Sequence, residues 1–350
     1  MEYINPILIN NRVMRPHKAS LYPDLTSRNV LTYSHWDFVE LWLKRNNKDA
    51  ALFYWNQARV FNQASNGLSN QSAPLLHYYS FMNATKALLS SRDIVFNPHH
   101  GVTAARNDVY TNADLATIGV LIKNKGIVPS LADYINDEDQ RKEYNLRDLL
   151  YNLPYIHRTY CLTYQIQEDM FIPIKNAHFV QDESSGMAYL IATLSKDFSY
   201  EGIGSLLPDC FQLVSDDSNG EYRVKSTHSL GCNFSTPSNS SELDSLILFH
   251  NEIRRNLYYI NGAETLWYIK SIANQDRQIL RSPTTITLAT MHRLSELSRY
   301  DPLKLNDFLL GQENWLLAEF IQQSPSQFID EISSEITGHQ FLIPNVRAAK

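Results

Sequence analysis

The first third of the chain has the apolar spacing of amphipathic helices. Residues 36–45 and 49–64 place apolar side chains about every 3.6 positions, so each segment would bury one face. Pro74 suits the first turn of a helix, and the mostly apolar run 75–91 follows it. These segments predict a helical lobe, which we assign to residues 35–160.

The middle of the chain has a different pattern, in which apolar and polar residues tend to alternate over short runs. Several such runs, all between residues 171 and 226, are rich in β-branched and aromatic residues, and Gly186 falls in a turn between two of them. Alternation with period two places one face of a strand in a core and leaves the other in water. We therefore expect a small antiparallel sheet of about four strands here.

The last third returns to helical spacing. The pair Ser282-Pro283 is typical of a helix start, because Ser caps free backbone N–H groups and Pro suits the first turn. The pair Asp301-Pro302 is typical of a helix end. We expect a helix over residues 283–300, with further helical segments after it.

Together these patterns predict an α+β protein that is mainly helical, with a small antiparallel sheet in the middle of the chain. Prolines in the first 34 residues remove backbone donors, so we expect no regular element there. The expected organisation is an irregular N-terminal arm at 1–34, a helical lobe at 35–160, a small β-rich region at 161–235 and a C-terminal helical lobe at 236–350.

Two short segments give more local predictions. Apolar runs on either side of Asn124-Lys125-Gly126 predict a short β-hairpin. The acidic run Asp137-Glu138-Asp139 is typical of a solvated face or of a helix start.

The charge balance argues against a general electrostatic grip on DNA or RNA, because the net charge is −6. A local basic site is compatible with it. The count of 3 Cys is low and odd, which is typical of a reducing compartment rather than of a disulfide framework. The first residues lack a signal-peptide pattern, and no apolar run approaches the roughly 18–20 residues that span a bilayer. We therefore expect a cytoplasmic protein without a membrane partner.

Several separated segments resemble one known family. They are residues 72–89, 100–102, 146–156 and 294–309. Their order and wide separation resemble the YaaC-like family over residues 35–335. The family has no assigned biochemical activity, so the resemblance implies a fold and a cytosolic location more than a function. His77 stands where the family pattern has an aliphatic residue, which directs attention to Tyr78, Asn83 and Lys86.

The predicted helix at 75–91 carries a polar stripe. Tyr79, Asn83 and Lys86 lie at positions i, i+4 and i+7, so they share one face. A partly buried Lys can bind a phosphate or a carboxylate as a point charge. The alternative is that Lys86 extends to solvent while Asn83 bonds to a loop backbone.

A second cation lies on the predicted helix at 283–300. His292, Glu296 and Arg299 form one polar face of it, and Arg299 can clamp an anion or a partner's carboxylate. The alternative is that Arg299 bonds to the last carbonyls of its own helix. His100 precedes Gly101, which lets the backbone bend sharply, so His100 can act as a general base or a metal ligand. A loop histidine can equally well only pack or hydrogen-bond.

Two patterns for metal chemistry are weak. His157 and Cys161 are four residues apart, as are His228 and Cys232, but no Cys-x-x-Cys pair accompanies them. We therefore assign no metal ligands.

Two nuclease patterns are also degenerate. Asp209 followed by Glu221 on the next predicted strand resembles the acidic pair of metal-dependent nucleases, although Arg223 replaces the usual Lys. Arg28 and His35 have the spacing of a helical ribonuclease motif, but such spacings also occur by chance.

The sequence favours an accessory cytosolic protein of unknown activity that binds an anionic small molecule or a protein partner. The expected binding residues are Tyr79, Asn83, Lys86, His100 and Arg299. No phosphate-binding glycine loop or dinucleotide motif is present, so we expect no cofactor. The alternative is a nuclease or another enzyme acting on nucleic acid or nucleotides.

Overall fold

The computed structural model describes residues 4–105, 114–167, 169–214 and 221–343. The chain divides into two compact units, each built from segments far apart in the sequence. The first, the sheet unit, comprises residues 1–31, 169–274 and 338–350, and the second, the helical unit, comprises residues 32–168 and 275–337.

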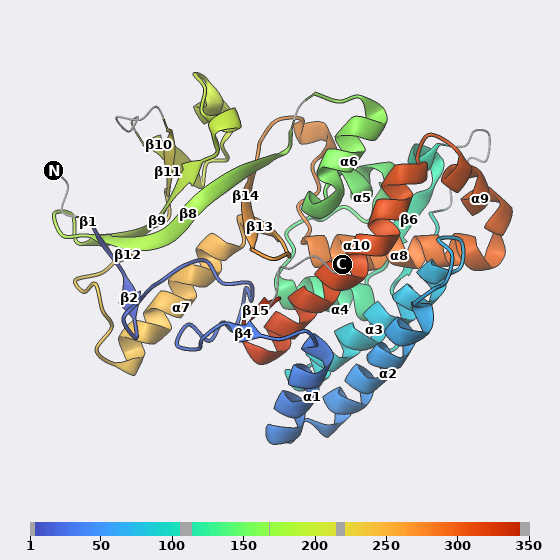
Figure 1. Cartoon of the computed structure of the whole chain (residues 1–350), viewed down its shortest axis with the longest axis horizontal. Coiled ribbons are helices and arrows are strands. Elements are labelled where there is room, and N and C mark those ends of the chain that lie inside the picture. The colour runs from blue at the N-terminus through green and yellow to red at the C-terminus, as the bar shows by residue number, and fades with distance from the viewer. Residues whose placement is uncertain (1–3, 106–113, 168, 215–220, 344–350) are drawn as a thin grey trace, which may run out of the picture. The chain divides into compact units, whose positions relative to one another are not determined.

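An antiparallel sheet of eight strands forms the sheet unit (Figure 1). Its central path runs β10-β11-β9-β8-β14-β13, while β1 pairs with β8 and β12 pairs with β9. The strands are β1 (Ile4–Pro6), β8 (Phe171–Asp182), β9 (Met187–Leu194), β10 (Phe211–Val214), β11 (Arg223–Ser226), β12 (Leu230–Gly231), β13 (Leu257–Ile260) and β14 (Leu266–Lys270).

The expectation of a small sheet in the middle of the chain is therefore wrong, although the α+β class holds. Three strands come from outside residues 161–235, because β1 lies near the N-terminus and β13 and β14 lie beyond the predicted region. Strand pairing is decided by long-range packing, and the apolar pattern of a short strand does not identify its partner.

Alternation along the strands builds the core of the sheet unit. Phe179 on β8 faces Leu190 on β9 across the strand pair, and both are fully or nearly fully buried. Helix α7 (Ser240–Arg254) adds Leu246 and Phe249 to the same apolar cluster. Burial of these large side chains against the sheet is the main favourable contribution to folding of this unit.

Two smaller strand pairs tie the chain ends into the sheet unit. Strands β2 (Leu8–Ile9) and β3 (Arg12–Val13) form a hairpin, and β4 (Val30–Leu31) pairs in parallel with β15 (Phe341–Leu342). The buried Lys18 ammonium donates to the backbone oxygen of Phe341 at 2.8 Å.

The helical unit contains helices and one three-stranded sheet. The helices are α1 (His35–Arg45), α2 (Asp49–Ser65), α3 (Ala73–Ser91), α4 (Ile127–Ile135), α5 (Leu146–Tyr151), α6 (Pro154–Tyr164), α8 (Pro283–Tyr300), α9 (Pro302–Leu310) and α10 (Asn314–Thr337). The sheet has the order β5-β6-β7, formed by β5 (Val102–Thr103), β6 (Gly119–Ile122) and β7 (Glu143–Asn145).

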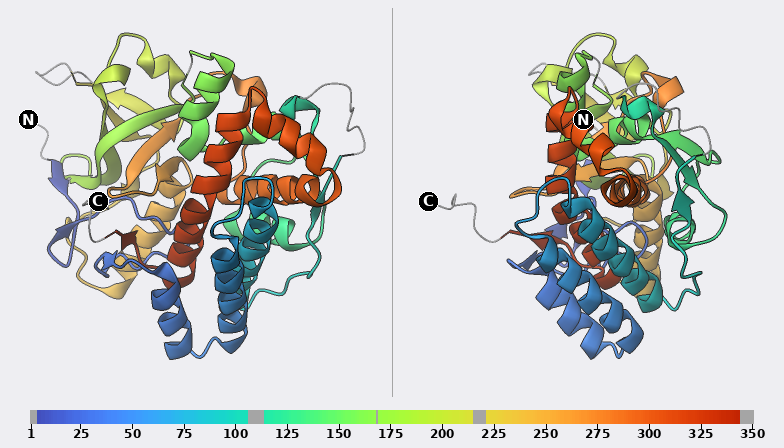
Figure 2. Two further views of the ribbon diagram at one scale, coloured as in Figure 1. Left: turned by 45° about the vertical axis from the view of Figure 1, so that its right-hand side comes forward. Right: turned by 90° about the vertical axis from the view of Figure 1, so that its right-hand side faces the viewer.

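Helix α3 is the centre of the helical unit. It packs against α2, α4, α8 and α10, and most of its side chains are buried. Figure 2 shows α2 and α3 side by side. Small residues make this close packing possible, and the Ser80 hydroxyl donates to the backbone oxygen of Ala58 on α2 at 2.9 Å. Phe81 stacks on Phe328 of α10 with ring centroids 4.3 Å apart.

The hairpin expected around residues 124–126 is wrong in its second half. Strand β6 forms as predicted, but the chain then starts α4 instead of a return strand. Gly126 precedes the helix with φ +134°, and Asn136 ends it in the left-handed conformation. Among the described residues, no helix combines the length and hydropathy needed to cross a bilayer.

Candidate anion-binding site

A backbone clamp holds His100 in place. The carbonyls of His99 and His100 accept hydrogen bonds from Ile127 and Val128 in the first turn of α4, at 2.8 and 3.1 Å. Gly101 and Gly126 make the approach possible, since a Cβ on Gly126 would lie 2.4 Å from the Gly101 Cα. The clamp uses backbone N–H groups that a helix start leaves unsatisfied, and it fixes the direction of the His100 side chain.

Three ring side chains from separate elements meet at this point. The Tyr78 hydroxyl on α3 hydrogen-bonds to His100 Nδ1. His292 on α8 meets the edge of Tyr78 with centroids 4.7 Å apart, and its ring lies 5.3 Å from that of His100. We name Tyr78, His100 and His292 the histidine cluster.

His292 is buried and has an unsatisfied nitrogen. Its relative exposure is 2%, and its Nδ1 makes no hydrogen bond to the described residues. The nearest acidic atom, Glu296 Oε2, is 3.8 Å away. Burial, with smaller contributions from His100 and Arg299, lowers the pKa of His292 to about 3. At neutral pH this residue is therefore an uncharged imidazole whose Nδ1 has no hydrogen-bond partner among the described residues.

Positive charge surrounds the other two members of the cluster. Burial, then the charges of Arg299 and Lys86, lowers the pKa of His100. Burial also raises the pKa of Tyr78, which keeps its hydroxyl protonated. The cluster is thus neutral itself and lies in a positive field.

Three cations supply that field. Lys86 and Arg299 act on His100, and Lys123 acts on both His100 and His292. Lys123 follows β6, and its backbone N–H donates to the Gly101 carbonyl at 2.8 Å. None of the three forms an ion pair with a carboxylate of the described residues. Uncompensated cations beside a buried imidazole attract an anion.

One acid lies beside the cluster. Glu296 Oε2 lies 3.2 Å from Arg293 Nη1, so the carboxylate is paired with a fourth cation. The Arg293 Nε also donates to the Gly119 carbonyl at 3.0 Å, which ties α8 to β6. The Glu296 charge also acts on Tyr78 and raises its pKa, so it offsets part of the positive field.

The expected binding residues differ in how they are placed. Lys86, His100 and Arg299 lie close enough for both cations to act on the His100 ring. Lys86 is half-buried, with its Nζ 5.5 Å from the centre of the Tyr54 ring. Tyr79 stacks on Phe61, and Asn83 donates to the Tyr79 carbonyl at 2.8 Å, so its amide bonds to its own helix.

The structural role considered for Arg299 also exists. Its Nε donates to the Ser295 carbonyl at 3.3 Å, near the end of α8. This single bond holds the side chain on its helix and leaves the other guanidinium nitrogens of Arg299 to act as donors. The helix-end role and the anion-binding role are compatible in this geometry.

Sequence reasoning did not include three members of the site. His292 was placed on the same polar face as Arg299 but not among the binding residues, and Tyr78 was singled out only through the family resemblance. Lys123 was not identified, because its position depends on the pairing of β5 with β6. The Gly101 and Gly126 pair is a signal for this contact, since such glycines allow backbones to approach closely.

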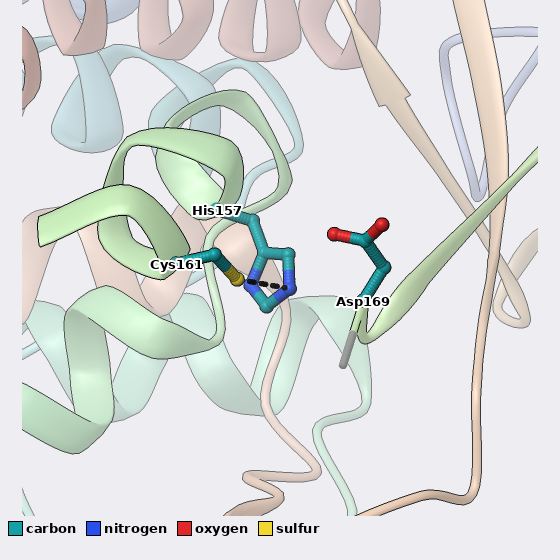
Figure 3. A group of neighbouring side chains, drawn as sticks. All are labelled: His157, Cys161 and Asp169. Atoms are coloured by element: carbon teal, nitrogen blue, oxygen red, sulfur yellow. Dashed lines mark hydrogen bonds between the residues drawn. The ribbon is translucent and has the colours of Figure 1, made fainter. Parts of the chain in front are cut away.

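The residues considered for zinc each have other partners. In Figure 3, His157 and Cys161 lie one turn apart on α6, with Cys161 Sγ 3.4 Å from His157 Nε2. His157 Nδ1 bonds to the Tyr151 carbonyl at 3.0 Å. In the sheet unit, His228 pairs with Glu252, and Cys232 Sγ donates to the Phe234 carbonyl at 3.0 Å.

The carboxylates of the nuclease pattern are not brought together. Strands β10 and β11 are antiparallel, with Phe211 opposite Ser226 and Val214 opposite Arg223. Asp209 precedes the start of β10 and Glu221 precedes the start of β11. Because the strands are antiparallel, their starts lie at opposite ends of the pair, which separates the two carboxylates by more than about 10 Å. They cannot share a metal ion. Of the second pattern, His35 lies in the helical unit, 3.6 Å from Asp330.

A separate cavity of about 410 Å³ lies elsewhere in the helical unit. Its polar lining residues are Thr117, Arg141, Glu143, Tyr144, Asn145, Asp148, Asp276 and Arg277. The size suits a small ligand. Arg141, however, is already bound to Asp139 through both carboxylate oxygens. Acidic and basic groups are mixed in this lining, so it defines no ligand charge.

The fold and the site define an α+β protein whose helical unit carries a neutral histidine cluster among cations. The sequence model of the YaaC-like protein family matches residues 24–336. The chain belongs to this family, as the resemblance of its separated segments predicted. Neither the curated proteins nor the solved structures include a match to the chain.

Proposed function

We propose that this protein binds an anionic small molecule at the histidine cluster and acts as an accessory protein rather than an enzyme. The observation that carries the proposal is that the charges of Arg299 and Lys123 act on both His100 and His292, and that of Lys86 on His100, while none of the three forms an ion pair with a carboxylate of the described residues. All three charges would attract an anion beside the cluster.

The two imidazoles suit binding better than acid catalysis. The pKa values of His100 and His292 both lie below the ordinary range, so neither ring holds an extra proton near neutral pH. A neutral imidazole still offers one N–H donor. A bound anion would raise both pKa values again, since a nearby negative charge favours the protonated form.

The cysteines support the cytosolic part of the proposal. Cys161, Cys210 and Cys232 form no disulfide. Burial raises the pKa of the Cys210 thiol to about 11, which keeps it protonated and unreactive. Cysteines without disulfides are what a reducing compartment favours.

Titration calorimetry with inorganic phosphate tests the proposal. We expect binding to the whole protein, weakened about ten-fold or more by Lys86→Met or Arg299→Met, because each removes a charge-assisted hydrogen bond. The matched controls are Lys48→Met, which removes an exposed ion pair with Asp93, and Arg45→Met, which removes an exposed Arg at the end of α1.

The controls should bind phosphate as the unchanged protein does. Absence of phosphate binding, or equal weakening by site and control variants, would show that the cations at the cluster do not form an anion site. Circular dichroism of each variant separates loss of binding from loss of fold.

A further inference from the structure

Half-buried aromatic rings lie beside the histidine cluster. Phe61 on α2 stacks on Tyr79 of α3, with centroids 5.3 Å apart and an angle of 27° between the rings. One end of α2 adds Tyr54, whose ring meets the edge of Phe96 at 6.2 Å. We name Tyr54, Phe61, Tyr79 and Phe96 the aromatic stripe.

The stripe is continuous with the cationic site. The Lys86 Nζ lies over the Tyr54 ring at 5.5 Å, and the same charge acts on His100. At the other end, the ring of Tyr79 lies 5.8 Å from that of Tyr78, which bonds to His100. Tyr79 and Lys86 are seven residues apart on α3, a rise of about 10 Å. The stripe therefore has the Lys86 charge at its Tyr54 end and the histidine cluster at its Tyr79 end.

These rings lie at the edge of the packing between α2 and α3 rather than in its interior. Trp55 and Ala58 of α2 are fully buried, and Ser80 of α3 bonds to the Ala58 carbonyl. All four rings of the stripe are only half-buried. If these rings served only the interior, they would be fully buried, as Trp55 is. Their exposed parts are therefore available to a planar ligand.

Resting on the anion site proposed above, we infer that the ligand is a nucleotide whose phosphate binds at the histidine cluster and whose base stacks on the aromatic stripe. Cations and aromatic faces side by side are the combination that binds a phosphate joined to a flat ring. His292, whose ring lies 5.3 Å from that of His100, belongs to the phosphate end of this arrangement.

The experiment compares three probes on the whole protein by calorimetry: inorganic phosphate, ribose 5-phosphate and adenosine 5′-monophosphate. We expect the adenine nucleotide to bind about 5- to 150-fold more tightly than ribose 5-phosphate, which is the range for one stacked base. Tyr79→Leu should reduce that ratio to near one. Trp315→Leu, which removes a half-exposed ring on α10, should leave the ratio as it is.

The outcomes separate the two proposals. Equal binding of the nucleotide and ribose 5-phosphate, with phosphate still bound, would overturn the nucleotide inference and keep the anion site. Absence of binding by all three probes would overturn the anion site itself. A ratio that Tyr79→Leu and Tyr54→Leu both leave unchanged, in variants that remain folded, would show that the base does not use the stripe.

Discussion

At the scale of single residues, the contact between Gly101 and Gly126 decides where His100 points. Both residues have positive φ, and each would place a Cβ less than 3 Å from the backbone of the other. Only glycine combines this conformation with this approach. The first turn of α4 can then bind the carbonyls of the His99–His100 segment, and the imidazole reaches Tyr78.

Replacing Gly126 by Ala should strongly destabilise the helical unit. The added methyl group meets backbone atoms that cannot move aside, and φ +134° is itself unfavourable for Ala, so we expect a loss of about 3 kcal/mol in the free energy of unfolding. Gly67→Ala is the control, because Gly67 has φ +82° but open space around it, and should cost about 1 kcal/mol. Urea unfolding followed by circular dichroism measures both; similar losses would contradict the close contact.

The types of residue along the chain predicted some members of this site. The other members depend on which side chains are buried together, which the sequence does not show. Gly101 was read as a sharp bend, and Lys86, His100 and Arg299 were chosen because they are polar residues in the segments that carry the family resemblance. The acidic run at 137–139 shows the limit of such reasoning. It was expected in water or at a helix start, but the side chains of Asp137 and Asp139 are 3% and 4% exposed. Besides the nearby Arg141, these carboxylates have partners at distant positions near the start of α8, which a local pattern does not reveal.

At the scale of elements, that acidic run ties the connection after α4 to the start of α8. The Asp137 carboxylate accepts a hydrogen bond from the Ser282 backbone N–H at 2.8 Å, where α8 begins. Asp139 accepts from Arg141 and from the Leu280 backbone N–H at 3.0 Å. Buried carboxylates thus fix α8, the helix that carries His292 and Arg299.

Arg141→Met should leave the buried Asp139 without its bidentate partner. Fully buried pairs lose about 3–5 kcal/mol when one partner is removed, and because Arg141 is half-exposed we expect about 2 kcal/mol. The control is Lys44→Met, which breaks the surface pair with Glu40 and should cost less than about 0.5 kcal/mol. Denaturant unfolding at pH 7 provides the comparison.

The pH dependence gives a second readout of the same pair. Burial acts to raise the pKa of Asp139, but the hydrogen bonds from Arg141 outweigh it, so the pKa lies below its usual value. A carboxyl group whose pKa is lowered by folding stabilises the folded state at pH values above its unfolded pKa of about 4. That stabilisation is lost as the pH falls below this value. The difference between Arg141→Met and the unchanged protein should therefore shrink in acid; a constant difference would contradict the ion pair.

Helices with strong local signals were predictable, and elements set by distant contacts were not. The expected helices at 36–45, 49–64 and 283–300 agree with α1, α2 and α8 within a residue. Their periodicity and caps are local properties. Helix α4 was mistaken for a strand because its apolar start follows a Gly, which is equally typical of a turn.

At the scale of the whole molecule, contacts between distant segments determine both units. The sheet unit pairs both β1 and β14 with β8, although β1 ends at Pro6 and β14 begins only at Leu266. The helical unit brings α3, which ends at Ser91, against α8, which begins at Pro283. The alternation and periodicity of the sequence show which residues are buried, but they do not show which buried faces meet. For that reason the sequence alone does not show that Tyr78, His100 and His292 meet.

Both units bury histidines in the neutral state, so the molecule should be sensitive to mild acid. Burial lowers the pKa of His77 and of His250 to about 4, and that of His292 to about 3. In the unfolded chain these histidines take up protons near pH 6.5, whereas in the native protein they stay neutral. The free energy of unfolding therefore falls as the pH drops below 6.5. From the shifts, each of the three costs about 2 kcal/mol at pH 5, a large share of the roughly 5–15 kcal/mol that stabilises a domain.

Urea unfolding between pH 7.5 and 5 measures this loss. The midpoint should fall steeply below pH 6.5, and His250→Phe should flatten the curve by removing one of these titrations. Leu248→Phe is the control, because it changes an exposed side chain on the same helix without changing a titratable group, and should leave the slope unchanged. A midpoint that stays constant to pH 5 would mean that the buried imidazoles accept protons in the native state.

A phosphate-type ligand should reduce the share of this acid destabilisation that comes from His292. The bound anion raises the pKa of that imidazole, so the native protein can take up the same proton as the unfolded chain.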